Sequence, residues 1–353
     1  MKPFVYQPLP SRVVFRVGAL DALVEEVARL GSRALVLCTP EQRNVAEEAA
    51  RRLGNRSVGI FDRAVMHVPV EVAHAAREAA ERLGADCCVA VGGGSTVGLG
   101  KAIAMVSNLP IIAVPTTYAG SEMTPIWGLT EGGLKRTGRD PKVQPRTVVY
   151  DPALTLTLPA GLSATSGLNA IAHCVEALYA ADGNPIASLM AEEGIRALGG
   201  SLPRIVEDPK NLDARGDALY GAWLGGAVLG TVGMALHHKL CHTLGGSFGL
   251  PHAETHTIVL PHAARYNERA APEAMARVAR ALGKSDDGPG ALWDLAQSLG
   301  CPMALEAIGL KRTDLDRAGD LAVKDPYWNP RAFDRAGIRA LLEEAWKGER
   351  PEH

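Results

Sequence analysis

Histidines gather in one stretch of this chain in a pattern that could support chemistry. Six of the ten histidines of the 353-residue sequence lie within residues 237–262. The segment that carries most of them, M-A-L-H-H-K-L-C-H-T-L-G-G-S-F-G-L-P-H, is otherwise apolar or small. His238 and His242 are four residues apart, so on a helix they would share one face. His252 follows after a G-G turn that could return the chain toward them.

Asn169 and His173 form a second pair with the same spacing, inside the small-residue run S-A-T-S-G-L-N-A-I-A-H-C. Two such pairs on two helices could converge on one point. Three imidazoles and one oxygen ligand are a standard set for a divalent transition metal. The oxygen ligand is normally an ionised carboxylate, however, and here it would be the neutral amide of Asn169. The amide in place of a carboxylate at position 169 therefore bears directly on whether the cluster binds a metal.

A purely structural interpretation of these histidines is the alternative. A single histidine in an apolar stretch is more often a hydrogen-bonded core residue than a ligand. Burying four or five imidazoles together without a shared task would leave many nitrogens unsatisfied, at about 1–3 kcal/mol for each. We therefore interpret the group as functional and assign structural or surface roles to His256, His262 and His353.

The composition is that of an ordinary globular protein, with 47% hydrophobic and 22% charged residues and a net charge of −2. A length of 353 residues suits two domains. The charge balance argues against a nucleic-acid partner. No apolar run reaches the roughly 18 residues of a membrane span, and the first residues have no run of signal-peptide length. The six cysteines are scattered without a framework spacing. We expect a cytoplasmic protein with no nucleic-acid or membrane partner.

The first half of the chain alternates strand-like and helix-like segments. Examples are the strand-like runs R-A-L-V-L-C-T, C-C-V-A-V and P-I-I-A-V-P, with helical stretches between them. Such alternation indicates β-α units and a mainly parallel sheet. After D-P at 151–152 the chain becomes rich in Ala, Leu and Gly with helical periodicity. We predict an α/β dinucleotide-binding domain over residues 1–154 and an all-α domain over residues 155–353 that carries the histidines.

A glycine loop follows one buried strand of the first domain. V-A-V-G-G-G-S places Gly93, Gly94 and Ser95 between this strand and a helix expected from about Leu99. Backbone N–H groups at such a place can approach a pyrophosphate closely. The pattern is not the usual G-x-G-x-x-G, and a lone glycine triplet is often only a tight turn.

A second loop strengthens the prediction of a dinucleotide site. A-V-P-T-T-Y-A-G-S-E places Thr116, Thr117 and Tyr118 at the end of another strand, at the sheet edge where open α/β sheets bind ligands. Thr39 follows an earlier strand, where a carboxylate would commonly hold the ribose, and Glu41 comes two residues later. The sequence therefore does not choose between NADH and NADPH.

Taken together, G-G-G-S, P-T-T-Y-A-G-S-E, the N-x-x-x-H and H-x-x-x-H pairs and the later P-H resemble the iron-containing alcohol dehydrogenase superfamily. Within it, the chain is similar to the maleylacetate reductase branch along nearly its whole length. The segments that carry this narrower resemblance are F-D-R-A-V-M-H-V-P, G-G-G-S-T-V-G-L-G-K, T-G-R-D-P-K-V-Q-P-R-T-V-V-Y-D-P, S-G-L-N-A-I-A-H-C-V-E-A-L-Y-A, L-H-H-K-L-C-H-T-L-G-G and P-Y-W-N-P-R.

The resemblance implies a dehydroquinate synthase-like or iron-type alcohol dehydrogenase fold and a set of site residues. In the metal-dependent members, the four ligands fall at the positions that here are Asn169, His173, His238 and His252. His242 would lie near the nicotinamide. Gly98 stands where the wider superfamily has an aspartate. This glycine and the amide at position 169 both depart from the metal-dependent pattern and both fit the reductase branch.

The resemblance further implies an NADH- or NADPH-dependent reduction of the C=C bond of maleylacetate to 3-oxoadipate, without a metal, by a homodimer. Imidazoles would stabilise the enolate in place of a metal. The two substrate carboxylates need cations, and the candidates are Lys239, Arg139, Lys142 and Arg331, with His67 and His237 as weaker ones. The alternatives are a metal-dependent alcohol dehydrogenase or dehydroquinate synthase-like enzyme on the same fold, and a non-catalytic nucleotide-binding protein.

Overall fold

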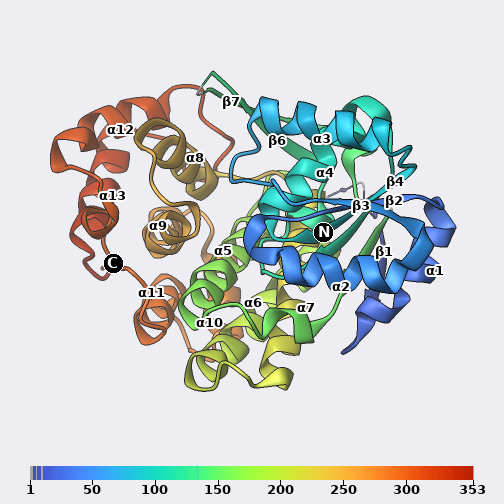
Figure 1. The fold of residues 1–353 in the computed structure, drawn as a ribbon. Helices are drawn as coiled ribbons and strands as arrows, with labels where there is room; N and C mark the ends of the chain where they lie inside the picture. Colours follow the sequence, from blue (N-terminus) through green and yellow to red (C-terminus); the bar gives the residue numbers. More distant parts are fainter. Residues whose placement is uncertain (1–2, 5, 9–10, 133, 353) are drawn as a thin grey trace. The chain divides into compact units, whose positions relative to one another are not determined.

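The computed structural model describes residues 3–4, 6–8, 11–132 and 134–352 (Figure 1). It divides into two compact units at the junction of Leu158 and Pro159. The described residues before Pro8 belong to the second of these units. His353 lies outside the described residues.

The first unit contains a six-stranded parallel sheet in the order β1-β8-β5-β4-β2-β3. Its strands are β1 (Arg12–Phe15), β2 (Ala34–Leu37), β3 (Ser57–Phe61), β4 (Cys87–Gly92), β5 (Ile111–Pro115) and β8 (Thr147–Tyr150). From β2 the chain passes to β3 on one side, and from β4 it passes to β5 on the other. The strand order therefore reverses between the neighbours β2 and β4, which is where open α/β sheets bind ligands.

Helices cover both faces of this sheet (Figure 1). They are α1 (Leu23–Leu30), α2 (Arg43–Leu53), α3 (Val70–Arg82) and α4 (Gly94–Ser107). Side chains alternate along a strand, so Val36 of β2 packs with α1 and α2, whereas Leu35 and Leu37 pack with α3 and α4. The predicted mainly parallel α/β fold is confirmed.

Two local features differ from the sequence prediction. Helix α4 begins at Gly94 rather than near Leu99, so most of the glycine loop forms the first turn of the helix. An antiparallel hairpin of β6 (Ile126–Glu131) and β7 (Leu134–Arg139) was not predicted. The two β-prone runs on either side of G-G would have signalled it.

The second unit is all helical over the described residues from Pro159 onward, as predicted. Its helices are α5 (Ala160–Leu178), α6 (Pro185–Glu207), α7 (Leu212–Thr231), α8 (Leu236–Phe248), α9 (His252–Asn267), α10 (Pro272–Ala281), α11 (Gly288–Ser298), α12 (Leu315–Val323) and α13 (Arg335–Lys347). Buried apolar residues of α8, α9, α12 and α13 form one core. Asn184 and Asn211 cap α6 and α7 through their side-chain oxygens.

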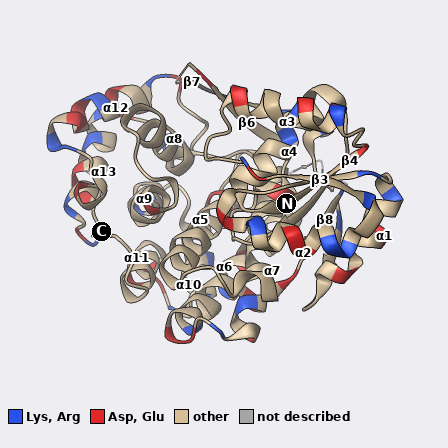
Figure 2. Cartoon of the chain, viewed as in Figure 1, with Lys and Arg blue, Asp and Glu red and all other residues tan. Residues whose placement is uncertain are grey.

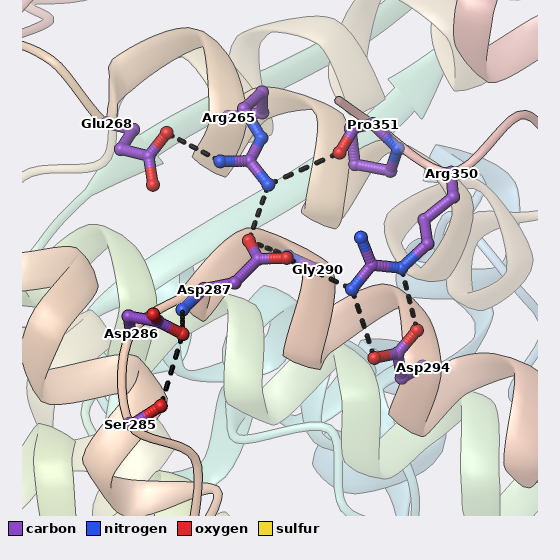
Figure 3. A network of polar contacts seen from close by, with 9 residues as sticks. All are labelled: Arg265, Glu268, Ser285, Asp286, Asp287, Gly290, Asp294, Arg350 and Pro351. Atoms are coloured by element: carbon purple, nitrogen blue, oxygen red, sulfur yellow. Dashed lines mark hydrogen bonds and ion pairs between the residues drawn. The ribbon is translucent and has the colours of Figure 1, made fainter. Parts of the chain in front are cut away.

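Charge is distributed unevenly over these helices. Helices α12 and α13 carry acidic and basic residues along their length, whereas α5 and α8 carry few (Figure 2). An ion-pair network joins α9, α11 and the C-terminal segment through Arg265, Asp287, Asp294 and Arg350 (Figure 3). Among the described helices none is by itself long and apolar enough to cross a membrane. Only α7 and α8 taken together, bent by 94° at their junction, meet the length and composition test.

Candidate active site

Helices α5, α8 and α9 bring six imidazoles together. The ring of His238 lies 5.2 Å from that of His173, 6.1 Å from that of His242 and 5.0 Å from that of His256, measured between centroids. The ring of His252 lies 4.2 Å from that of His256. The helical four-residue spacing of the sequence therefore does place these side chains in one cluster.

Two members of this cluster had lesser roles in the sequence analysis: His256 a structural one, and His237 that of a weaker candidate for binding a substrate carboxylate. His256, given a structural role above, lies four residues after His252 on α9 and is buried. His237 packs its ring 4.8 Å from that of His256. The four-residue spacing of the predicted pairs also joins His256 to His252, since these two share a helix face. His262, in contrast, lies outside the cluster, with Nδ1 3.9 Å from a carboxylate oxygen of Glu344.

Glu176 anchors the cluster. It is fully buried on α5, and its Oε2 lies 2.7 Å from His238 Nδ1. Its two oxygens also accept the backbone N–H groups of Ala235 and His237, at 2.8 and 2.7 Å. The carboxylate thus caps the N-terminus of α8 and holds one imidazole at the same time. It lies three residues after His173 on the same helix, but its hydrogen bonds are to residues 59–62 positions further on, on and just before α8.

Burial keeps the inner imidazoles neutral. It lowers the pKa of His238 to about 3 and that of His237 to about 4. Burial, followed by the neighbouring imidazoles, also holds the pKa of His173 and of His256 well below the ordinary value. Within the described part of the chain, several buried polar atoms of this cluster have no hydrogen-bond partner: Asn169 Oδ1, His173 Nδ1, His238 Nε2 and both ring nitrogens of His256.

One side of the cluster is open to solvent. His242 and His252 are exposed, and Nδ1 of His242 lies 3.0 Å from the hydroxyl oxygen of Tyr327. Lys239 is half-buried, with Nζ 5.8 Å from the centroid of the Tyr327 ring. Asn329 fixes the segment that carries this tyrosine. Its side-chain oxygen accepts a hydrogen bond from the amide of Asn267 at 2.9 Å, and its own amide N–H donates to the side-chain oxygen of Asn267 at 2.6 Å.

The other predicted carboxylate-binding cations are divided between the two units. Arg331 donates to the backbone oxygen of Tyr266 at 3.2 Å and stacks on its ring at 3.8 Å, so its charge is already engaged. Arg139 and Lys142 are exposed residues of the α/β unit, as is His67. Within the helical unit, Lys239 directly follows His238 on α8.

The residues at the family's metal positions do not fit a tightly held ion. In the described chain, the groups of three whose donor atoms lie within 4.8 Å of one another are His237, Cys241 and His256, and Glu176, His237 and His238. His173, His238 and His252 do not form such a group. The oxygen donor, Asn169, is a neutral amide, which holds a divalent ion less strongly than a carboxylate does.

The glycine loop of the α/β unit has the geometry of a phosphate cradle. Gly93 is the N-cap of α4, and no side chain caps this helix. The first N–H groups of the helix are therefore available to an anion, which the helix dipole also favours. A Cβ built on Gly93 would lie 2.9 Å from Thr117 Oγ1, so a larger residue would disturb the second loop. Gly94 and Ser95 follow in the first turn.

The second loop and the end of β2 flank the cradle. Strand β4 pairs with β5 on one side and with β2 on the other, so Thr116 and Thr39 follow the two neighbouring strands. Thr116 is buried with its hydroxyl unpartnered among the described residues, and Tyr118 is fully buried. A hydrogen bond from Thr39 is the main cause that lowers the pKa of Glu41, so a carboxylate does lie at this strand end.

Lys101 fixes the segment that follows the second loop, and the sequence did not single it out. It is fully buried on α4, and Nζ lies 2.7 Å from the backbone oxygens of Ser121 and Ile126 and 3.0 Å from Thr124 Oγ1. Burial lowers the pKa of this ammonium to about 7. The segment that follows the second loop is therefore held by a side chain about two helical turns beyond Gly94.

Comparison with known proteins places this fold and these residues in a family. Residues 10–152 match the family model of iron-containing alcohol dehydrogenase, and residues 163–346 match the C-terminal model of the same family. The chain belongs to the iron-containing alcohol dehydrogenase family and is an oxidoreductase.

Individual relatives are similar over their full lengths. Maleylacetate reductase of Burkholderia cepacia is 60% identical over 352 residues, covering 99% of this chain and 100% of the relative. A crystal structure of a putative alcohol dehydrogenase from Ralstonia eutropha has a TM-score of 0.99 and 62% identity, with 100% of both chains covered. The crystal structure of maleylacetate reductase from Agrobacterium tumefaciens has a TM-score of 0.96 and 54% identity, covering 99% of this chain and 100% of that one.

Proposed function

We propose that this protein reduces the C=C bond of maleylacetate with NADH or NADPH and yields 3-oxoadipate. The observation that carries the proposal is the histidine cluster with an amide at its oxygen position, found in a chain 60% identical to a maleylacetate reductase. Maleylacetate is a dicarboxylate whose C=C is conjugated to a ketone. A bound nicotinamide would supply hydride to the carbon β to that ketone, which leaves an enolate, and a proton then completes the reduction at the α carbon.

The α/β unit supplies the dinucleotide site in this proposal. Gly93, Gly94 and Ser95 offer backbone N–H groups and the N-terminus of α4 to the pyrophosphate. The residues Thr39, Thr116, Thr117 and Tyr118 complete the site at the ends of the neighbouring strands. The lack of any side-chain cap on α4 supports this assignment, because an uncapped helix start is ready to bind an anion.

The helical unit supplies the substrate site, lined by Asn169, His173, His238, His242 and His252. The developing enolate needs hydrogen-bond donors, which can be worth 10²–10³-fold in rate for each donor. The side-chain amide of Asn169 can donate, whereas the aspartate of a metal-binding relative would repel the anion. His242 and Tyr327 form the hydrogen-bonded pair on the open side of the cluster and are suited to deliver the proton. Lys239 is placed to bind one substrate carboxylate.

We further propose that the reaction needs no metal, that the protein works as a homodimer and that it acts in the cytoplasm. The neutral amide at position 169 supports the first of these proposals, and the set of His173, His238 and His252 is not among the described groups whose donor atoms lie within 4.8 Å of one another. A metal-dependent alcohol dehydrogenase is the alternative within this family, and the amide at position 169 disfavours it.

The test is maleylacetate-dependent oxidation of NADH and of NADPH, with the product identified by mass spectrometry. We expect 3-oxoadipate to form in step with cofactor oxidation, and simple primary alcohols to give no reduction of NAD⁺ or NADP⁺. Alcohol oxidation without turnover of maleylacetate would show that the alternative is correct.

A further inference from the structure

Glu176 lies at the meeting point of two backbone N–H groups and one imidazole nitrogen. Backbone N–H groups of Ala235 and His237 reach its two oxygens, and His238 Nδ1 lies 2.7 Å from Oε2. The carboxyl group is fully buried at the N-terminus of α8. Because both oxygens already accept N–H groups and the helix dipole favours an anion there, we assign Glu176 as a carboxylate.

A carboxylate can only accept hydrogen bonds, so the nitrogen of His238 that faces it must carry the proton. The ring of His237 supports the same assignment. Its Nε2 lies 3.0 Å from the backbone oxygen of His256, which also can only accept, so His237 carries its proton on Nε2. Its bare Nδ1 then faces His238 Nδ1 at 3.4 Å and offers a second, weaker acceptor.

We propose that Glu176 is a positioning residue that holds His238 as the Nδ1–H tautomer, so that the Nε2 atom that His238 presents to the site is a hydrogen-bond acceptor. This Nε2 is buried and has no partner among the described residues. The backbone oxygen of His256 supports the arrangement through His237. A hydrogen-bond relay from α9 through α8 to α5 thus fixes the polarity of one atom.

This inference rests on the proposed function and refines it. A bare Nε2 cannot donate a hydrogen bond to an enolate. The bare Nε2 can accept a hydrogen bond from a group that carries two protons, such as an amide or a water molecule. The second proton of that group is then directed toward the substrate oxygen. Asn169 is a donor of this kind, and His173, one turn further along the same helix, stacks 5.2 Å from His238. The aspartate of metal-binding relatives would have no proton to offer.

The tautomer can be measured directly. Nitrogen-15 NMR of histidine-labelled, chelator-treated protein distinguishes a protonated from a bare ring nitrogen, and His238→Gln identifies the signals. We expect the wild-type His238 to show a protonated Nδ1 and a bare Nε2. A protonated Nε2 in the wild-type protein would overturn the inference. Because this spectrum needs no substrate, it stands apart from the maleylacetate assay, which can fail or succeed independently.

A matched pair of variants tests the role of Glu176 itself. In Glu176→Gln an amide N–H can face the Nδ1 atom of His238, so we expect the Nε2–H tautomer of His238 to appear. The kcat should fall at least about tenfold, the scale of losing an outer-shell partner of a site histidine, with the KM for the dinucleotide within about twofold.

Asp287→Asn is the control, because it also converts a helix-capping carboxylate to an amide within the helical unit (Figure 3). It should lower the melting temperature and leave the His238 tautomer and kcat unchanged. An unaltered tautomer in Glu176→Gln, or an equal loss of kcat in Asp287→Asn, would reduce Glu176 to a structural cap and contradict the inference. If Glu176→Gln does not fold, the wild-type spectrum alone decides.

Discussion

The glycine loop and the histidine cluster are built in opposite ways. The loop is local in sequence, and its working groups are backbone N–H groups at one helix start. The cluster combines side chains from α5, α8 and α9 and depends on a buried carboxylate that holds one imidazole. A backbone site tolerates changes of side-chain chemistry but not of side-chain size. A side-chain network should respond to the loss of a single proton or charge.

The largest effect is expected for Asn169→Asp. The new carboxylate removes an amide donor and places a negative charge where the enolate forms, so maleylacetate turnover should fall about 10³-fold. The variant should also gain affinity for Zn²⁺ or Fe²⁺, because the anionic ligand is restored. Steady-state kinetics and metal titration check both effects. An Asn169→Asp enzyme with wild-type turnover would remove the amide from the mechanism.

His242→Ala and His238→Ala should each lower kcat by about 10²-fold. The first loses the partner of Tyr327, and the second loses the acceptor fixed by Glu176. The exposed His242 should be replaceable with little change in melting temperature. Unchanged kcat with a lowered melting temperature in both variants would instead indicate that these histidines are structural.

The same comparison shows what the sequence could predict. The glycine loop and the Asn169–His173 and His238–His242 pairs follow from spacing along one element, although α4 begins at Gly94 rather than near Leu99. His256 was missed although it repeats the four-residue spacing after His252, whereas Glu176 and Tyr327 were missed because their roles arise from contacts with residues far away in the sequence. Glu176 accepts N–H groups from residues 59 and 61 positions further on, and no local pattern encodes such a bond.

Gly93→Val tests the glycine loop, the backbone site in this comparison. A Cβ at this position already comes within 2.9 Å of Thr117 Oγ1, and a branched side chain would also cover the N–H groups at the helix start. We expect the KM for NADH to rise about 10–100-fold, the equivalent of losing one charge-assisted hydrogen bond, with the fold retained. Ordinary cofactor affinity in a folded Gly93→Val protein would contradict the placement of the phosphates.

Acid should weaken the helical unit through its buried imidazoles. His238 and His237 have pKa values of about 3 and 4 in the folded protein, below the 6.5 of an unfolded histidine. The unfolded chain therefore binds more protons below pH 6.5. Each such histidine should lower the free energy of unfolding by about 1.4 kcal/mol per pH unit as the pH falls toward the folded value. Urea unfolding between pH 7.5 and 5 checks this, and a stability independent of pH in that range would speak against neutral buried imidazoles.

The central claim is that this histidine cluster reduces maleylacetate without a metal. The most direct measurement is the turnover of maleylacetate before and after treatment with EDTA, with the metal content of the same samples determined by elemental analysis. We predict less than stoichiometric metal and the same rate in both samples. A stoichiometric, tightly bound ion whose removal abolishes turnover and whose return restores it would contradict the account.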